Sequence, residues 1–160
     1  MKINWKKKVF ASKYELFAVN QKIGELNKKS FSSTSIGNLN NSKLKFQKRG
    51  FFNSETEITD LIQKKVVGKI KFNTWGNKAE INIESKKIDW KSDSFWGKKW
   101  SVLENGQPII KYRGSASKGE IESSISNDHL ILTGLFVFNY YVEMMMIIIA
   151  STTSVIVATS

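Results

Sequence analysis

The chain has 160 residues, enough for one domain with its own hydrophobic core, and its 25 Lys and Arg outnumber its 14 Asp and Glu, for a net charge of +11. It has no cysteine and one histidine, His129, which excludes disulfides, thiolate chemistry, iron–sulfur clusters and the usual zinc sites. We therefore expect no metal and no cofactor. Between Leu130 and Ser160 the only charged side chain is Glu143, so a basic, aromatic-rich body precedes an almost uncharged tail.

The body has the pattern of antiparallel β structure, with short alternating apolar runs between Gly, Asn and Ser residues. The polar segment 30–42 is predicted to be a flexible loop rather than an ordered ligand-binding loop. The amino terminus lacks the apolar stretch of a secretion signal, so we expect no signal peptide and a cytoplasmic location. The predicted strands lie near residues 5–10, 14–20, 22–26, 43–48, 55–61, 66–73, 78–84, 88–91, 100–103, 109–113 and 119–125.

Two hairpins can be given a register. A hairpin over residues 66–84 closes with matching apolar faces and sets Lys71 opposite Glu80, a charge pair on the wet face. The Asn-Gly dipeptide is the strongest turn signal in the chain. A two-residue turn there would scramble the faces, whereas a three-residue loop pairs Trp100 with Tyr112. We predict a bulged, three-residue loop.

The tail predicts a long helix. Ser-Asn-Asp at 126–128 offers three N-cap candidates before residues 130–150, which are apolar on every side. This length spans about 30 Å, enough to cross a bilayer core. Asn139 and Glu143 in mid-span oppose that interpretation, because a carboxylate at the bilayer centre is costly. We expect a helix buried in a closed barrel, with both polar groups satisfied by strand groups or at a barrel mouth. For residues 151–160 a frayed end, a continued helix and a short strand all stay open.

The order of these elements resembles a known superfamily. A Val67-Gly68-Lys69-Ile70 strand feeds a hairpin, a second hairpin follows over 100–110, and a Gly119-Glu120-Ile121 strand precedes the apolar terminal helix. This order is similar to that of the Tubby C-terminal-like superfamily, above all its LURP-one-related and phospholipid-scramblase-like branch. The resemblance implies a twelve-stranded barrel wrapped around a hydrophobic C-terminal helix. The resemblance does not identify particular residues of this chain as a lipid-binding site.

The predicted fold is therefore mainly β: a closed antiparallel barrel of about 12 strands enclosing a hydrophobic C-terminal helix. It forms one domain over residues 1–160. The strands occupy about 5–125, the core helix about 128–150, and a short tail 151–160. Lysine usage over arginine and abundant asparagine indicate an AT-rich genome, and we expect a bacterial source.

The predicted function is a non-enzymatic binding module that docks peripherally on anionic phospholipid membranes. Lysines interleaved with bulky aromatics suit a membrane interface or stacked bases, but two arginines in the whole chain argue against nucleic acid. The competing interpretation is a lysine-rich exterior with aromatics packed in the barrel wall. A tail-anchored protein whose 130–150 helix spans the bilayer, and a structural or protein-interaction barrel, are also compatible with the sequence. The candidate contacts are Lys86, Lys87, Lys91, Phe95, Trp96, Lys98 and Lys99.

No catalytic arrangement is apparent in the sequence. It contains no phosphate-cradling Gly loop, nucleophile elbow or paired metal ligands. His129 stands at the helix start without a recognisable partner. An apolar helix is expected to raise the pKa of Glu143, but one buried carboxylate without a second group makes no mechanism. We therefore expect no enzymatic activity.

Overall fold

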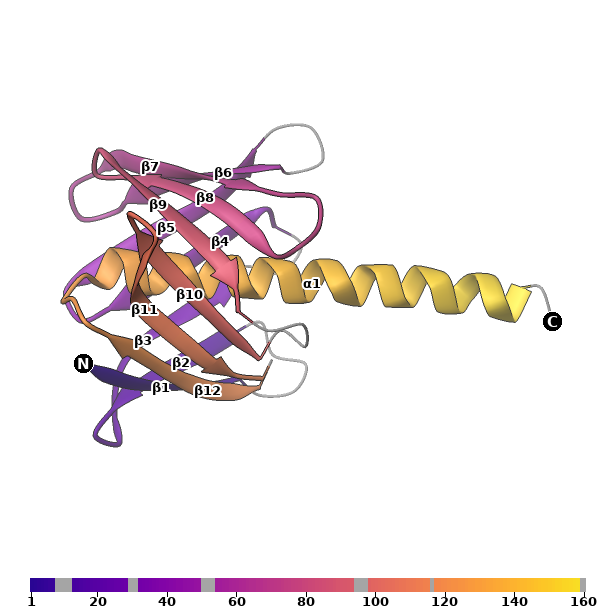
Figure 1. Ribbon diagram of the computed structural model, residues 1–160, viewed down its shortest axis with the longest axis horizontal. Coiled ribbons are helices and arrows are strands. Elements are labelled where there is room, and N and C mark those ends of the chain that lie inside the picture. Colours follow the sequence, from indigo (N-terminus) through magenta and orange to yellow (C-terminus); the bar gives the residue numbers. More distant parts are fainter. Residues whose placement is uncertain (8–12, 29–31, 50–53, 94–97, 116, 159–160) are drawn as a thin grey trace.

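The structure, a computed structural model, describes residues 1–7, 13–28, 32–49, 54–93, 98–115 and 117–158, with side chains described as far as residue 149 (Figure 1). In these ranges twelve antiparallel strands form one closed barrel in which each strand pairs with its sequence neighbours and the first pairs with the last. A single α-helix, α1 (Asp128–Ala158), runs into and through the barrel. The predicted fold class is confirmed. The strands are β1 (Lys2–Lys7), β2 (Lys13–Ala18), β3 (Gln21–Lys28), β4 (Thr34–Leu39), β5 (Ser42–Arg49), β6 (Glu55–Asp60), β7 (Lys65–Phe72), β8 (Lys78–Ile83), β9 (Lys86–Ser92), β10 (Lys99–Glu104), β11 (Gln107–Gly114) and β12 (Lys118–Ser123).

The first half of α1 fills the barrel. The side-chain oxygen of Asn127 accepts a hydrogen bond from the Leu130 backbone N–H at 2.9 Å, so Asn127 is the N-cap among the three candidates. Phe136 then stacks on Phe46 of β5 with ring centroids 4.4 Å apart, and Phe138 on Trp100 of β10 at 3.9 Å. The inward-facing residues of every wall strand thus meet a helix that is apolar on all sides, which explains its all-round hydrophobicity.

Strand β4 overturns the expectation of a flexible loop over residues 30–42, of which the structure describes 32–42. Its inward positions are Ser35, Gly37 and Leu39, all buried. A side chain at Gly37 would press on Leu132 of α1 at 3.1 Å, so small residues face inward where the helix lies close to the wall. The apolar alternation that identifies a strand is missing here because the helix takes up the space.

Both predicted hairpin registers are confirmed, with two corrections. Lys71 does lie opposite Glu80, but it forms an ion pair with Glu55 of β6 at 3.9 Å, while Glu80 pairs with Lys87 at 2.7 Å. In the other hairpin Trp100 lies opposite Tyr112 as predicted. The bulge expected at this hairpin is present, after Val102, but the predicted loop length is wrong, because the turn has two residues.

Candidate functional site

The two ends of the barrel differ, because α1 begins at one and leaves through the other (Figure 1). At the first end Asn40, in the turn between β4 and β5, donates hydrogen bonds to Asp128 at the helix start. We call the opposite end the exit rim. It is formed by the ends of β1, β3, β5, β7, β9 and β11 and by the beginnings of the strands that follow them.

Beyond the exit rim α1 projects out of the barrel (Figure 1). Burial ends around Tyr141, and the five side chains from Met145 to Ile149 are 53–70% exposed. The helix continues to Ala158, so a continued helix is the correct alternative for residues 151–158. No charged residue occurs after Glu143. The core helix was expected to reach residue 150, whereas the barrel is too short to cover it that far.

The projecting helix exposes a continuous run of large apolar side chains, which the surface of a folded protein seldom does. Within the described residues it is the one helix with a stretch, Asp128–Ile149, that is long and apolar enough to cross a membrane. Just over half of the most apolar part of this stretch is buried in the barrel. The part beyond Glu143 runs for 15 residues to Ala158, about 22 Å at 1.5 Å per residue. In this conformation the first half of the 130–150 stretch is packed inside the barrel.

An exposed tryptophan lies at the same rim. Trp75, in the turn between β7 and β8, is 88% exposed. The turn is held against the helix: the Asn73 backbone N–H donates to the Tyr141 hydroxyl at 3.2 Å, and that hydroxyl donates to the Lys78 carbonyl. A side chain at Gly76 would touch Tyr141 and Met144. Trp75 is thus carried on a turn that is hydrogen-bonded to the helix at its exit.

The exit rim is predominantly basic. Its described acidic side chains are Glu55, Asp93 and Glu143, together with Glu15, Glu80 and Glu120, which lie directly opposite Lys6, Lys71 and Arg113. At the opposite end the lysines are more nearly balanced by acids, namely Asp60, Glu84, Glu104, Glu122 and Asp128. Positive charge is therefore concentrated at the end from which the apolar helix emerges. The basic residues at or next to described strand ends on the exit rim are Lys6, Lys7, Lys13, Lys28, Lys48, Arg49, Lys71, Lys78, Lys91, Lys98, Lys99, Arg113 and Lys118.

Glu143 lies in this rim among three lysines. Lys28 Nζ lies 2.8 Å from Glu143 Oε2, and Lys48 Nζ lies 3.6 Å from the same oxygen. Asn139 donates a hydrogen bond to Glu143 Oε1 at 2.9 Å and accepts one from Lys7 Nζ at 3.3 Å. The expectation that Asn139 and Glu143 are satisfied by strand groups at a barrel mouth is confirmed.

The charge state of Glu143 differs from the expectation. Burial acts to raise its pKa, but hydrogen bonds from Lys28 and Asn139 and the charges of Lys28 and Lys48 outweigh burial, so the pKa lies below the usual value. Glu143 is therefore an ionised partner of lysines. The sequence showed the apolar helix around it but not the lysines that three different strands bring to it.

The predicted contact residues are divided between the two ends. Lys86 and Lys87 begin β9 and pair with Glu104 and Glu80, at 2.8 and 2.7 Å. Lys91 lies near the other end of β9, about 13 Å from Lys87 at 3.3 Å per residue. Lys98 and Lys99 lie with Lys91 at the exit rim; Phe95 and Trp96 lie outside the described residues. The structure does not bring Lys86 and Lys87 together with the rest of the set.

The neighbouring aromatics belong to the core. Trp90 and Trp100 are 3% and 1% exposed, and the Trp90 indole N–H donates to the Gly134 carbonyl of α1 at 3.1 Å. For these two residues the packed-wall interpretation is confirmed. Trp75, an exposed aromatic at the exit rim, was not among the predicted contacts, although its place beside Gly76 in a predicted turn was a usable signal.

His129 has partners that the sequence did not reveal. Its Nδ1 lies 2.7 Å from Glu84 Oε1, in the turn between β8 and β9, and its Nε2 lies 3.6 Å from Asp60 Oδ2 at the end of β6. Asp60 also accepts hydrogen bonds from the backbone N–H groups of Ile62 and Gln63, at 2.7 and 2.9 Å. These contacts tie the start of α1 to two turns and give His129 a structural role.

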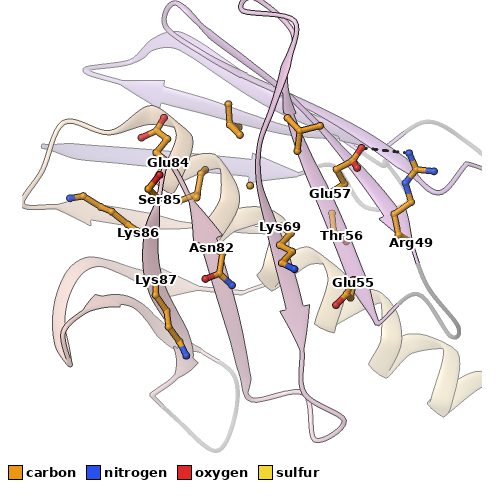
Figure 2. A pocket seen from close by; sticks show the side chains of 14 residues that line it. Arg49, Glu55, Thr56, Glu57, Lys69, Asn82, Glu84, Ser85, Lys86 and Lys87 are labelled. Carbon is orange, nitrogen blue, oxygen red and sulfur yellow. Dashed lines mark ion pairs between the residues drawn. The ribbon is translucent and has the colours of Figure 1, made fainter.

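A groove of about 510 Å³ crosses the outer wall over β6, β7 and β8 and the start of β9 (Figure 2). Its floor is formed where β7 lacks a side chain at Gly68. The labelled side chains carry both signs of charge, as in the Arg49–Glu57 ion pair at 3.5 Å (Figure 2). They come from separate strands and do not converge on one point, unlike the groups of a built ligand site.

Comparison of the chain with protein-family models, with curated proteins and with solved structures gives no match. The function of the exit rim and its projecting helix is therefore proposed from their geometry alone.

Proposed function

We propose that the protein is a membrane-docking module that places its exit rim on an anionic phospholipid surface and inserts the projecting part of α1 into the adjoining leaflet. The observation that carries this proposal is the emergence of an uncharged helix through a basic rim. Lysines attract anionic headgroups, and the helix removes its exposed Met and Ile side chains from water.

The apolar contribution can be estimated from exposure. Full burial of a Met or Ile side chain stabilises by about 1.5–3 kcal/mol. The five side chains from Met145 to Ile149 are 53–70% exposed, so moving them into hydrocarbon contributes about 5–9 kcal/mol in total. A single acyl chain gives only marginal binding, and one route to stable anchoring combines an apolar insertion with a basic patch. The exit rim supplies both.

The geometry also supports a defined depth of insertion into the membrane. Glu143 and the lysines around it are charged and stay at the level of the headgroups, which leaves residues 144–158 for the hydrocarbon. Trp75 on its helix-bound turn suits the interface, where tryptophan is enriched. The cytoplasmic leaflet is the expected surface because it holds the anionic lipids.

Flotation with lipid vesicles tests the proposal. We expect the protein to float with vesicles that contain phosphatidylserine, to float less with neutral phosphatidylcholine vesicles, and to lose part of its binding as salt screens the lysines. Equal recovery with both vesicle types would contradict the part of the proposal that assigns binding to electrostatic attraction. A protein that stays in solution with all vesicles, or that sediments as a self-associated species without lipid, would contradict the proposal.

A further inference from the structure

The lysines around Glu143 form a partly enclosed basic cluster, which we call the lysine cluster and define as Lys7, Lys28 and Lys48. They come from β1, β3 and β5, alternate strands of one part of the wall. All three reach the same pair of helix residues, Asn139 and Glu143, at 2.8–3.6 Å. The cluster lies where α1 leaves the barrel, and its Lys48 side chain is only 15% exposed.

The charge of the cluster is not balanced by the contacts that hold it. Three ammonium groups face one carboxylate, because Asn139 and the Tyr14 hydroxyl near Lys7 are neutral. Desolvation lowers the pKa of Lys7 and of Lys48, Glu143 opposes this, and Lys28 adds to the lowering by repulsion. A second anion at this position would relieve the repulsion and stabilise all three charges.

Aromatic rings complete the walls of the cluster. Lys7 Nζ lies 4.6 Å from the centre of the Tyr14 ring, and Lys48 Nζ lies 4.9 Å from that of Tyr140. These contacts hold each ammonium against a ring face and reduce the freedom that binding an anion would otherwise remove. The cations are therefore arranged before any ligand arrives.

We propose that the lysine cluster binds the phosphate of a membrane lipid, and that it favours a phosphomonoester headgroup, as in phosphatidic acid, over the phosphodiester of phosphatidylserine. This inference rests on the proposed function. With residues 144–158 in the leaflet the cluster lies at the depth of the lipid phosphates. A phosphomonoester carries about −1.5 to −2 at neutral pH, against −1 for a phosphodiester, and so matches the excess of about two positive charges.

The test compares vesicles of equal surface potential that contain phosphatidic acid or phosphatidylserine in phosphatidylcholine. We expect the wild-type chain to bind the phosphatidic acid vesicles more tightly. Lys48→Gln should reduce this binding about fivefold, the factor that corresponds to about 1 kcal/mol per basic residue near an anionic surface. Lys48→Arg keeps the charge and should retain the preference. The matched control is Lys86→Gln, which removes an exposed, ion-paired lysine at the opposite end and should leave the preference unchanged.

Each outcome distinguishes the site from the docking surface. Equal binding to both vesicle types, or a preference that survives Lys48→Gln, would overturn the phosphate site while leaving membrane docking in place. An equal loss in Lys86→Gln would show that only total charge matters and would overturn it too. Binding of inorganic phosphate to the cluster together with equal binding to both vesicle types would assign the cluster to the free ion and overturn the lipid assignment. Absence of binding to any vesicle would overturn both proposals.

Discussion

The projecting helix gives the sharpest prediction, for the variant Ile148→Asp. Ile148 is 53% exposed and lies five residues beyond Glu143, about 7.5 Å further along the helix axis. On an insertion scale Asp costs about 2.5–3.5 kcal/mol at the centre of a membrane helix, whereas Ile contributes about −0.3 to −0.6 kcal/mol. At this shallower depth we expect the substitution to cost about 2–3 kcal/mol, a 30- to 150-fold loss of vesicle affinity.

The matched control is Val19→Asp. Val19 is 97% exposed in the turn between β2 and β3, at the end of the barrel opposite the exit rim. Its φ of 48° lies in the left-handed region that Asp tolerates better than Val, so the fold should accept the change. Both variants alter net charge equally. Vesicle flotation over a lipid titration measures both, and similar affinities for Ile148→Asp and the wild type, or an equal loss in Val19→Asp, would refute insertion of the helix.

Three further predictions concern the barrel and are measured by urea unfolding. Phe136→Ala removes the ring stacked on Phe46 and should lower the free energy of unfolding by about 3–5 kcal/mol; a loss below about 1 kcal/mol would contradict a packed interior. Gly134→Ala drives a methyl group into the Tyr112 hydroxyl, which donates to the Ile131 carbonyl at 3.0 Å, and should cost about 1–3 kcal/mol; an unchanged midpoint would mean that the helix is seated elsewhere. Backbone hydrogen bonds from Gln63 and Ile62 lower the pKa of Asp60 despite its burial, so its contribution to stability is present above the unfolded value of about 3.9 and is lost as pH falls through the lower folded value. Asp60→Asn should flatten that acid limb, and an identical pH profile would count against it.

The barrel could be predicted from sequence because alternation and turn chemistry act locally. Lys71 opposite Glu80 and Trp100 opposite Tyr112 follow from matching apolar faces across a turn. Strand β4 could not be predicted in this way, since its inward Ser35 and Gly37 are small for a tertiary reason, the closeness of α1. A bulge was expected at the second hairpin, but its position after Val102, behind a two-residue turn, is a property of the strand pairing.

The exit rim was harder to predict because it is assembled from distant segments. The lysine cluster brings Lys7, Lys28 and Lys48, from three separate strands, to Glu143 near the other end of the chain, and no local pattern connects them. The sequence pattern placed the contacts on one stretch, 86–99, whose two ends the fold directs to opposite ends of the barrel. Hydropathy identified α1 as apolar on all sides, but only the length of the barrel decides which half of it is covered.

The most direct measurement uses the absence of cysteine from the chain, which allows one environment-sensitive fluorophore to be attached at a single introduced thiol. The pair of variants is Ile148→Cys on the projecting helix and Val19→Cys at the opposite end. With anionic vesicles we predict a blue shift at position 148, quenching there by lipids labelled in their acyl chains, and no change at position 19. A label at position 148 that stays in a water-like environment with vesicles bound, or that shifts equally without lipid, would contradict insertion of the helix.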